Sequence, residues 1–353
     1  MNGKDEHRTR TAVPVPHSVF RVVDAPPGER FGLWKESISC IFDVEAERET
    51  RLLDFDAEVE AWLLGQLMLA RTTSRAQSWR RSASTIARDG MDHYMVQLFA
   101  EGEMEAGDGP RSTFADGQAL VVFDLAREMT SRTPSFTNLS LVIPREALSD
   151  ALFAPDDQHM RTLRTAEPLA AMLRDHLVAL TRVGRRLTTT QAREVSRATT
   201  TMVAACLNGC EHAAGLDAAP RVAQLGTCKR LIEQNLSDPG LSASQICGTA
   251  GLSRTKLYAL FAPLGGVNAH IRERRLRRAL SALADPRNRF RPVYEIAATC
   301  GFRNESAFSR AFRRRFGRSP REARHEGVDL APAARTASGA GHRYEHWLHH
   351  LAV

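Results

Sequence analysis

The chain has 353 residues and a formal net charge of +7, with 43% hydrophobic and 25% charged residues. This composition is ordinary for a globular protein, and the length suffices for two domains that each bury a core. No run of eighteen apolar residues occurs, and the first twenty residues lack a long apolar segment, so the sequence predicts neither a membrane span nor a secretion signal. The six cysteines include no CxxC pair, which is typical of reduced thiols in the cytoplasm.

The charge is divided unevenly along the chain. Residues 221–325 carry 21 Lys and Arg against 7 Asp and Glu, a net charge of +14, whereas the remaining residues carry 27 and 34, a net charge of −7. A strongly basic block beside an acidic one indicates a polyanionic partner for one end of the chain only.

Residues 1–28 are polar and rich in proline, which predicts a disordered arm. Residues 31–40 fit a short amphipathic helix. From residue 54 to 143 the apolar residues alternate with polar ones in several short runs, separated by turns such as Asp89-Gly90 and Asp116-Gly117, and a short helix starting near Ser82 interrupts them. This pattern predicts an antiparallel barrel or jelly roll.

Several residues in this strand region are candidates for the walls of a pocket that takes a small aromatic or apolar effector: Trp62, Trp79, Tyr94 and Phe123. Aromatic residues on strands are more often plain core. Arginines that could pair with an effector carboxylate also occur here, at Arg71, Arg80 and Arg81.

The same region argues against a metalloenzyme. It contains one histidine, His93, and no carboxylate is placed to complete a ligand set, so the sequence predicts no metal, no cofactor and no catalytic residues. Three further histidines lie in the last eight residues, at His346, His349 and His350. They could bind a metal ion adventitiously, but a flexible tail over residues 326–353 is the simpler interpretation.

Residues 144–214 turn helical, with apolar faces of 3.6-residue period, and residues 215–220 are expected to form a linker. Two alternatives remain open for these helices. They either mediate dimers, above all through the helix over 188–214, or only cover one face of the barrel.

The densest pattern lies in residues 293–321. Small or apolar residues at Ile296, Ala297 and Cys300 precede Gly301, which fits a positive-φ turn, and Asn304 is placed to cap a second helix. That helix has a phenylalanine-rich back and a Ser/Arg front, as a helix in a DNA major groove requires. A degenerate copy lies upstream, with Ser242 and Ser253 as caps and Gly251 as the turn residue. The sequence therefore predicts two helix-turn-helix units.

These residues carry a resemblance. The span from Arg221 to Arg324 resembles the DNA-binding domain of the AraC/XylS family of bacterial transcription regulators, through Ile296-Ala297, Gly301-Phe302, Phe308-Ser309-Arg310-Ala311-Phe312, Phe316-Gly317 and Ser319-Pro320, and upstream through Leu241-Ser242, Gly251-Leu252-Ser253, Leu257, Phe261 and residues 271–276. The resemblance implies seven helices, of which a rigid central one holds two recognition helices in successive major grooves. Ala259 departs from the family pattern, because a long polar residue is common there, and Cys247 replaces the usual alanine.

The region before it resembles the cupin-like sensory domain of one branch of this family, in particular the regulators of aromatic-amine and nitrile catabolism. Trp34-Lys35-Glu36, Arg81, residues 86–89, Asp92-His93-Tyr94 and Asp116-Gly117 carry this similarity. The expected fold is thus an α+β protein of two domains. Residues 29–215 form an antiparallel cupin-like barrel with helical dimerisation segments, and residues 221–325 form an all-α domain with two helix-turn-helix units.

The resemblance implies a cytoplasmic, nucleoid-associated transcription regulator, an activator that responds to a small effector, with promoter DNA, RNA polymerase and a second copy of the chain as partners. A repressor or effector-independent regulator is the first alternative, and a cupin-type enzyme is the second. Ten residues are predicted to contact DNA, the groove-facing ones by reading base edges and the basic ones by holding phosphates: Arg254, Thr255, Lys256, Tyr258, Glu305, Ser306, Ser309, Arg310, Arg313 and Arg314.

Overall fold

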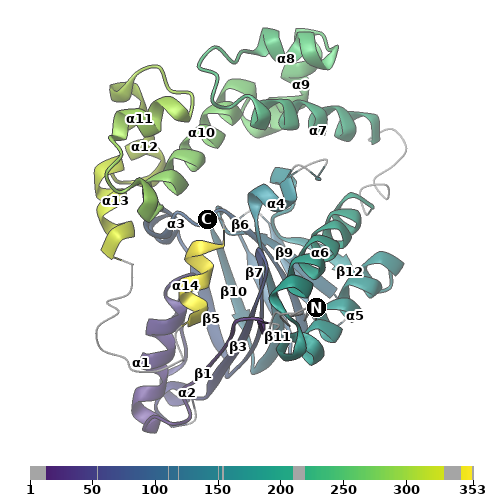
Figure 1. Cartoon of the computed structure of the whole chain (residues 1–353), viewed down its shortest axis with the longest axis vertical. Helices are drawn as coiled ribbons and strands as arrows, with labels where there is room; N and C mark the ends of the chain where they lie inside the picture. The colour runs from purple at the N-terminus through teal and green to yellow at the C-terminus, as the bar shows by residue number, and fades with distance from the viewer. Residues whose placement is uncertain are drawn as a thin grey trace, which may run out of the picture.

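The computed structural model describes residues 13–53, 55–109, 111–117, 119–149, 151–152, 155–209, 219–329 and 343–351. Figure 1 shows a sandwich of strands at the bottom and a layer of helices above it. None of the helices in the described ranges is long and apolar enough to cross a membrane.

Two antiparallel sheets form the sandwich domain. The larger sheet has the order β1-β3-β4-β11-β6-β9-β12, formed by His17–Arg21, Ala57–Leu64, Leu67–Ser74, Phe136–Pro144, His93–Glu101, Ala119–Asp124 and Arg161–Arg164. The smaller sheet has the order β2-β5-β10-β7-β8, formed by Asp43–Glu45, Gln77–Arg81, Met129–Thr133, Met104–Gly107 and Ser112–Ala115. The predicted antiparallel strands are confirmed, but the two sheets face each other as an open sandwich and do not close into the expected barrel.

The two faces of the larger sheet have different environments because successive strand residues point to opposite sides. Leu139 and Leu141 of β11 belong to a core that includes Leu173 and Leu177 of α5 and Val203 of α6. Helices α5 (Pro168–Val183) and α6 (Thr189–Gly209) thus cover this face. The opposite face turns toward the smaller sheet, where it borders a second core rich in aromatic residues.

Four shorter helices complete the sandwich domain. They are α1 (Pro27–Ile38), α2 (Arg48–Leu53), α3 (Ala83–Asp89) and α4 (Arg145–Ser149). Helix α1 matches the amphipathic segment expected near residues 31–40, because Phe31, Trp34 and Ile38 are buried. Helix α3 is the short helix expected from Ser82, whose side chain accepts a hydrogen bond from the Thr85 amide.

Seven α-helices form the helical domain within residues 219–329, as the resemblance implied. They are α7 (Ala219–Gln234), α8 (Ala243–Ala250), α9 (Arg254–Phe261), α10 (Val267–Ala284), α11 (Val293–Thr299), α12 (Glu305–Phe316) and α13 (Pro320–Asp329). Residues 215–218 of the predicted linker over 215–220 lie outside the described residues, whereas residues 219–220 are the first two of α7 and not part of a linker.

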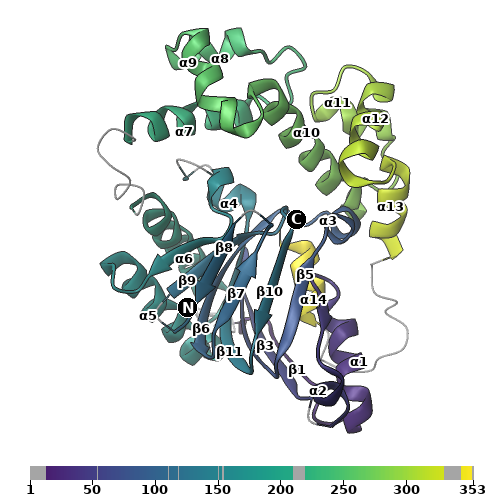
Figure 2. The ribbon, with the colours of Figure 1, turned by 180° about the vertical axis from the view of Figure 1, so that it is seen from behind.

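Helix α3 of the sandwich packs against the helical domain, on α10, α12 and α13 (Figure 2). Its Ile86 is buried in the same apolar cluster as Leu280 and Phe312. Ion pairs also join the two domains, between Arg277 of α10 and Asp124 of β9 at 3.6 Å and between Lys229 of α7 and Asp157 at 3.1 Å. One sandwich helix therefore helps to complete the core of the second helix-turn-helix unit.

Both expected loose ends differ from the prediction where the structure describes them. Residues 17–21 of the predicted arm form strand β1, paired with β3, while residues 1–12 lie outside the described residues. In the predicted tail, α13 continues to Asp329 and helix α14 (Arg343–His350) packs back onto the sandwich, with Tyr344, Leu348 and Leu351 buried in its aromatic core. The sequence suggested a flexible tail because it is rich in small and polar residues, whereas the structure docks its last described segment through these buried side chains and through hydrogen bonds to Ser37 and His93.

Candidate nucleic-acid interface and ligand cavity

Local caps set the shape of the second helix-turn-helix unit, α11–α12. Gly301 has a φ of 85°, and a Cβ added there would lie 2.2 Å from the carbonyl oxygen of Leu236, so the turn needs glycine for both conformation and space. The Asn304 side chain accepts a hydrogen bond from the Ala307 amide at 2.9 Å, which caps α12. Helix α12 ends at Gly317, whose φ is 75°. The predicted turn residue and both ends of α12 are confirmed.

The first unit, α8–α9, follows the same plan. Ser242 and Gln245 form a reciprocal capping box at the start of α8, and Gly251 ends the helix with a φ of 65°. Ser253 caps α9 by accepting a hydrogen bond from the Lys256 amide at 3.3 Å. The buried back of α9 consists of Leu257, Leu260 and Phe261. The upstream repeat is therefore a second unit with the same turn chemistry.

Helix α10 connects the two units, which lie toward its opposite ends (Figure 1). Phe308, Phe312 and Phe316 of α12 pack in one cluster with the second half of α10, whereas α9 packs in another cluster with Val267 and Ile271. The Glu273 carboxylate accepts hydrogen bonds from Arg277 and Arg315, each at 2.9 Å. Burial alone would raise the pKa of Glu273, but these two arginines hold it below its ordinary value. This ion-paired carboxylate ties α10 to α12.

The ten predicted DNA-contacting residues all lie on α9 or α12, away from these cores. Nine are exposed and Ser309 is half-buried, and Tyr258 keeps 48% of its surface exposed although it is aromatic. Arg254 donates a hydrogen bond to Ser244 at 2.6 Å, which restrains its side chain. Among the residues that the structure describes, no carboxylate lies within 4.0 Å of the guanidinium of Arg310, Arg313 or Arg314, and the nearby Glu322 only attracts Arg313 over a longer distance. These three side chains can therefore pair with phosphates or bases.

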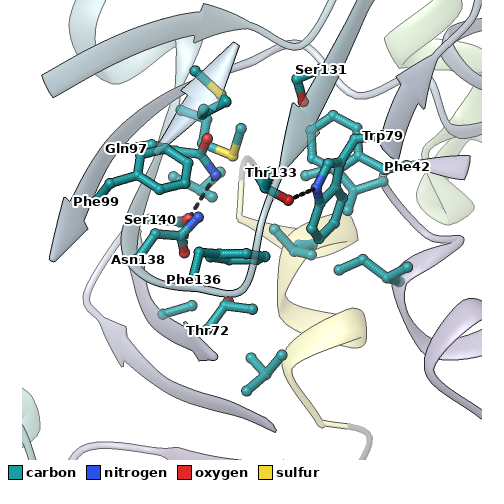
Figure 3. Close-up of a pocket in the computed structure, with 18 of the residues that line it drawn as sticks. Phe42, Thr72, Trp79, Gln97, Phe99, Ser131, Thr133, Phe136, Asn138 and Ser140 are labelled. Carbon is teal, nitrogen blue, oxygen red and sulfur yellow. Dashed lines mark hydrogen bonds between the residues drawn. The ribbon is translucent and has the colours of Figure 1, made fainter. Parts of the chain in front are cut away.

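A second candidate site lies inside the sandwich (Figure 3). Side chains from three neighbouring strands point into a cavity there: Met68, Ala70 and Thr72 of β4, Met95, Gln97 and Phe99 of β6, and Phe136, Asn138, Ser140 and Val142 of β11. Trp79, Met104, Met129, Ser131 and Thr133 of the smaller sheet face them, and Phe42 is another part of the wall. The Trp79 indole donates a hydrogen bond to the Thr133 hydroxyl at 3.0 Å.

The four aromatic residues predicted for the effector pocket are separated by the structure. Trp79 lines the cavity. Trp62 and Tyr94 belong to the core on the other face of the sheet, and the Tyr94 hydroxyl donates to the Pro155 carbonyl oxygen at 2.7 Å. Phe123 is buried beside His159 and is not part of the cavity wall. Alternation along a strand is visible in the sequence, but which of its two sides faces a cavity depends on the packing of the second sheet.

The three arginines considered for an effector carboxylate lie away from the cavity wall as well. Arg71 and Arg80 are exposed. Arg81 is fully buried, and its guanidinium binds both carboxylate oxygens of Asp89, at 2.7 and 2.9 Å. Sequence reasoning missed the polar residues that line the cavity from β6 and β11, which are Gln97, Asn138 and Ser140. A polar residue inside an otherwise apolar strand is the signal that could have identified them.

No three His, Cys, Asp or Glu side chains within the described ranges are arranged to hold a metal ion. His93 is buried, and burial lowers its pKa below the ordinary value. Its Nε2 donates to the carbonyl oxygen of Leu348 in α14 at 3.1 Å, so this histidine contacts the C-terminal helix.

Two family models match the chain, a helix-turn-helix domain over residues 246–326 and an AraC-binding-like domain over residues 34–208. The transcriptional activator NphR of a Rhodococcus species is 28% identical over 318 residues, which span 88% of this chain and 93% of NphR. Regulatory protein SoxS of Escherichia coli is 32% identical over 96 residues, 27% of this chain and 86% of SoxS.

The crystal structure of the AraC-like transcriptional activator CuxR aligns with a TM-score of 0.53 and 27% identity, covering 74% of this chain and 93% of CuxR. The two family models fall on the sandwich and on the paired helix-turn-helix units in turn, and NphR matches along most of both. The chain therefore belongs to the AraC family of DNA-binding transcription regulators, a family of regulators and not of enzymes.

Proposed function

We propose that the protein binds promoter DNA through α9 and α12 and activates transcription in response to a small effector bound in the sandwich. The observation that carries this proposal is the exposed front of α12, where Ser306, Ser309 and Arg310 lie on a helix whose phenylalanine back is fixed to α10. A guanidinium can bind guanine O6 and N7 with two hydrogen bonds, which makes Arg310 the first candidate for reading a base. Activation is proposed because NphR and CuxR are both described as transcriptional activators.

Replacing Arg310 with alanine tests base reading. The operator would first be found by mapping the DNA that the protein binds across a genome. We expect Arg310→Ala to lose about 1–3 kcal/mol of specific binding and to relax the choice at one base pair. A binding titration against the operator and its single-base variants measures both effects. The exposed Arg182 of α5 is the matched control, and equal behaviour of the two variants would remove Arg310 from the interface.

The affinity for DNA should depend steeply on salt. Arg254, Lys256, Arg313 and Arg314 are exposed on the two recognition helices, and four neutralised phosphates give a slope of about −4 for log K against log salt. We expect Arg313→Ala to make this slope less steep by about one while leaving base preference unchanged, the converse of Arg310→Ala. A flat salt dependence would show that the basic helices are not the main contact.

The remaining partners are proposed from the family. RNA polymerase is the expected contact of an activator at a promoter, and a cytoplasmic location beside the nucleoid follows from DNA binding. A homodimer is proposed through the α5–α6 face, where Met172 and Leu169 are 57% and 40% exposed although both are apolar. Sedimentation equilibrium at micromolar concentrations measures the assembly state directly, and a monomer there would reject the dimer.

A further inference from the structure

The wall of the sandwich cavity includes residues from the far end of the chain. Tyr344 and Leu348 of α14 line the cavity together with the strand residues. The Tyr344 hydroxyl lies 2.6 Å from Ser37 Oγ of α1, and Ser37 also donates a hydrogen bond to Glu345. The Leu348 carbonyl oxygen accepts from His93. The C-terminal helix thus inserts two side chains into the proposed effector site.

The space left over is small. The cavity has a volume of about 60 Å³, enough for a few water molecules, whereas an engineered cavity that binds benzene measures about 150 Å³. An effector the size of one aromatic ring therefore requires that some lining group move. Most of the other lining residues lie on strands that the sheets fix, and Ile38, Ile41 and Phe42 lie at the end of α1 and in the short segment that leads into β2. The side chains of the short helix α14 are therefore the lining groups that are easiest to displace.

Helix α14 is held by the burial of its apolar side chains and by the hydrogen bonds to Ser37 and His93, and no part of it belongs to a sheet. It has eight residues, and an isolated helix of this length is not stable in water, so its folding depends on the docking of Tyr344, Leu348 and Leu351. Its release breaks no strand pairing, because the described residues 343–351 belong to neither sheet. Tyr344 is a neutral phenol near pH 7 both docked and released, because the ordinary pKa of tyrosine is about 10 and burial raises the pKa of Tyr344 further.

The lining also restricts the charge of a ligand. Among the described residues that line the cavity, none is Asp, Glu, Lys, Arg or His. Polar groups gather on neighbouring strands, where Gln97 Nε2 donates to Ser140 Oγ at 3.0 Å and Ser140 donates to Asn138 Oδ1 at 3.4 Å. Primary amides offer both donors and acceptors. An ionised ligand would be buried here without a counter-charge, which is costly, whereas a neutral polar group can be matched.

We propose that the cavity binds an uncharged molecule with a flat apolar body and one hydrogen-bonding group, and that this molecule takes the place of Tyr344 and Leu348. The polar group pairs with the row of Gln97, Asn138 and Ser140, and the body lies among Trp79 and the methionines. The proposal rests on the proposed function, since it specifies the effector class and the step by which the effector enters.

Competition on the full-length protein tests the ligand class. The neutral dye N-phenyl-1-naphthylamine, which fluoresces in apolar surroundings, serves as the reporter. Benzamide, benzoate and protonated benzylamine at pH 7 serve as competitors, because they are similar to one another in size and differ in charge. We expect benzamide to displace the dye at concentrations at least tenfold lower than either ion. Displacement by benzoate or benzylammonium at concentrations equal to those of benzamide, or no displacement by benzamide, overturns the uncharged class.

Variants of α14 test the exchange of side chains for ligand. Tyr344→Ala combined with Leu348→Ala should tighten binding of the dye at least tenfold, because the two groups that occupy the site are removed. His346→Ala, at an exposed position of the same helix, is the matched control and should leave binding unchanged. Weaker or unchanged binding by the double variant overturns the proposed exchange.

Hydrogen exchange on the unaltered protein avoids any effect of substitution on folding. Saturation with the dye should speed amide exchange in residues 343–351, whereas slower exchange there would show that α14 stays docked on the ligand and would refute its displacement. A titration of operator DNA with the same preparation tests the proposed DNA binding separately from the proposed ligand exchange. DNA binding without these ligand effects rejects this proposal alone, and ligand effects without DNA binding reject the proposed function.

Discussion

Substitution of Gly301 by alanine is expected to abolish DNA binding by the second helix-turn-helix unit. Two costs add at this residue. Its φ of 85° lies in the left-handed region, which costs a non-glycine residue about 1–2 kcal/mol. The new Cβ would also lie 2.2 Å from the Leu236 carbonyl oxygen and 2.6 Å from Arg275 Nε. Because a backbone atom blocks the site, α11 must shift, and we expect a total loss of about 3 kcal/mol or more in stability.

Two other glycines separate the cost of the positive φ from the cost of the close contact with Leu236. Gly251 occupies the equivalent turn of the first unit with a φ of 65°, but a Cβ added there would meet nothing within 4 Å, and Gly248 in α8 has neither strain nor a close neighbour. Gly251→Ala should therefore lose about 1 kcal/mol, and Gly248→Ala should gain a few tenths of a kcal/mol.

Tryptophan fluorescence shows whether the sandwich stays folded in these glycine variants. All four, Trp34, Trp62, Trp79 and Trp347, lie outside residues 219–329, so tryptophan fluorescence reports on the sandwich alone. We expect Gly301→Ala to retain a native fluorescence spectrum while operator binding is lost. Urea denaturation followed by circular dichroism at 222 nm measures the stability of the helical domain. If Gly301→Ala and Gly251→Ala lose the same stability there, the close contact with Leu236 is not what makes Gly301 necessary.

Replacing Arg81 with methionine is expected to unfold or strongly destabilise the sandwich. Its guanidinium is 0% exposed and pairs with Asp89, which is 1% exposed, and it also donates to the carbonyl oxygens of Leu125 and Ile41 at 2.5 and 2.7 Å. Removal of the arginine leaves a buried carboxylate without a counter-charge, which typically costs about 3–5 kcal/mol. Urea denaturation followed by tryptophan fluorescence measures this loss.

The loss of stability caused by Arg81→Met should extend to the DNA-binding domain. Asp89 is the last residue of α3, and α3 packs against α10, α12 and α13. Arg80→Met, one position away and exposed, is the control and should remain within about 0.5 kcal/mol of the parent protein. Adding Asp89→Leu to Arg81→Met should recover much of the stability, because no unpaired charge then remains buried. A double variant as unstable as Arg81→Met would show that the contacts to Leu125 and Ile41 carry the effect.

The helix-turn-helix units could be predicted because their information is local. Serine and asparagine caps, glycines at positive φ and a phenylalanine repeat of helical period each act within a few residues. Ser242, Ser253, Asn304, Gly251 and Gly301 all have the predicted roles. The sequence alone also predicted the basic front of α12, since residues of an amphipathic helix that do not belong to the apolar face must point outward.

The cavity could not be predicted in the same way. Alternation in β4, β6 and β11 shows that these strands have two faces, but only the second sheet decides which face borders a cavity. Because of this packing, Trp79 lies in the cavity wall, whereas Trp62 and Tyr94 lie in the core on the opposite face of the larger sheet. The ion pair of Arg81 and Asp89 was equally hidden from the sequence, because it depends on the bend between β5 and α3.

The end of the chain shows the same limit most clearly. By itself the sequence determined two recognition helices, their caps and the charge that favours DNA, because these properties depend on neighbouring residues and on composition. The docking of α14 in the sandwich was decided by tertiary structure alone. Tyr344 meets Ser37 across 307 positions of sequence, and no local pattern specifies a partner that far away, since the contact depends on a cavity that exists only after the two sheets have packed.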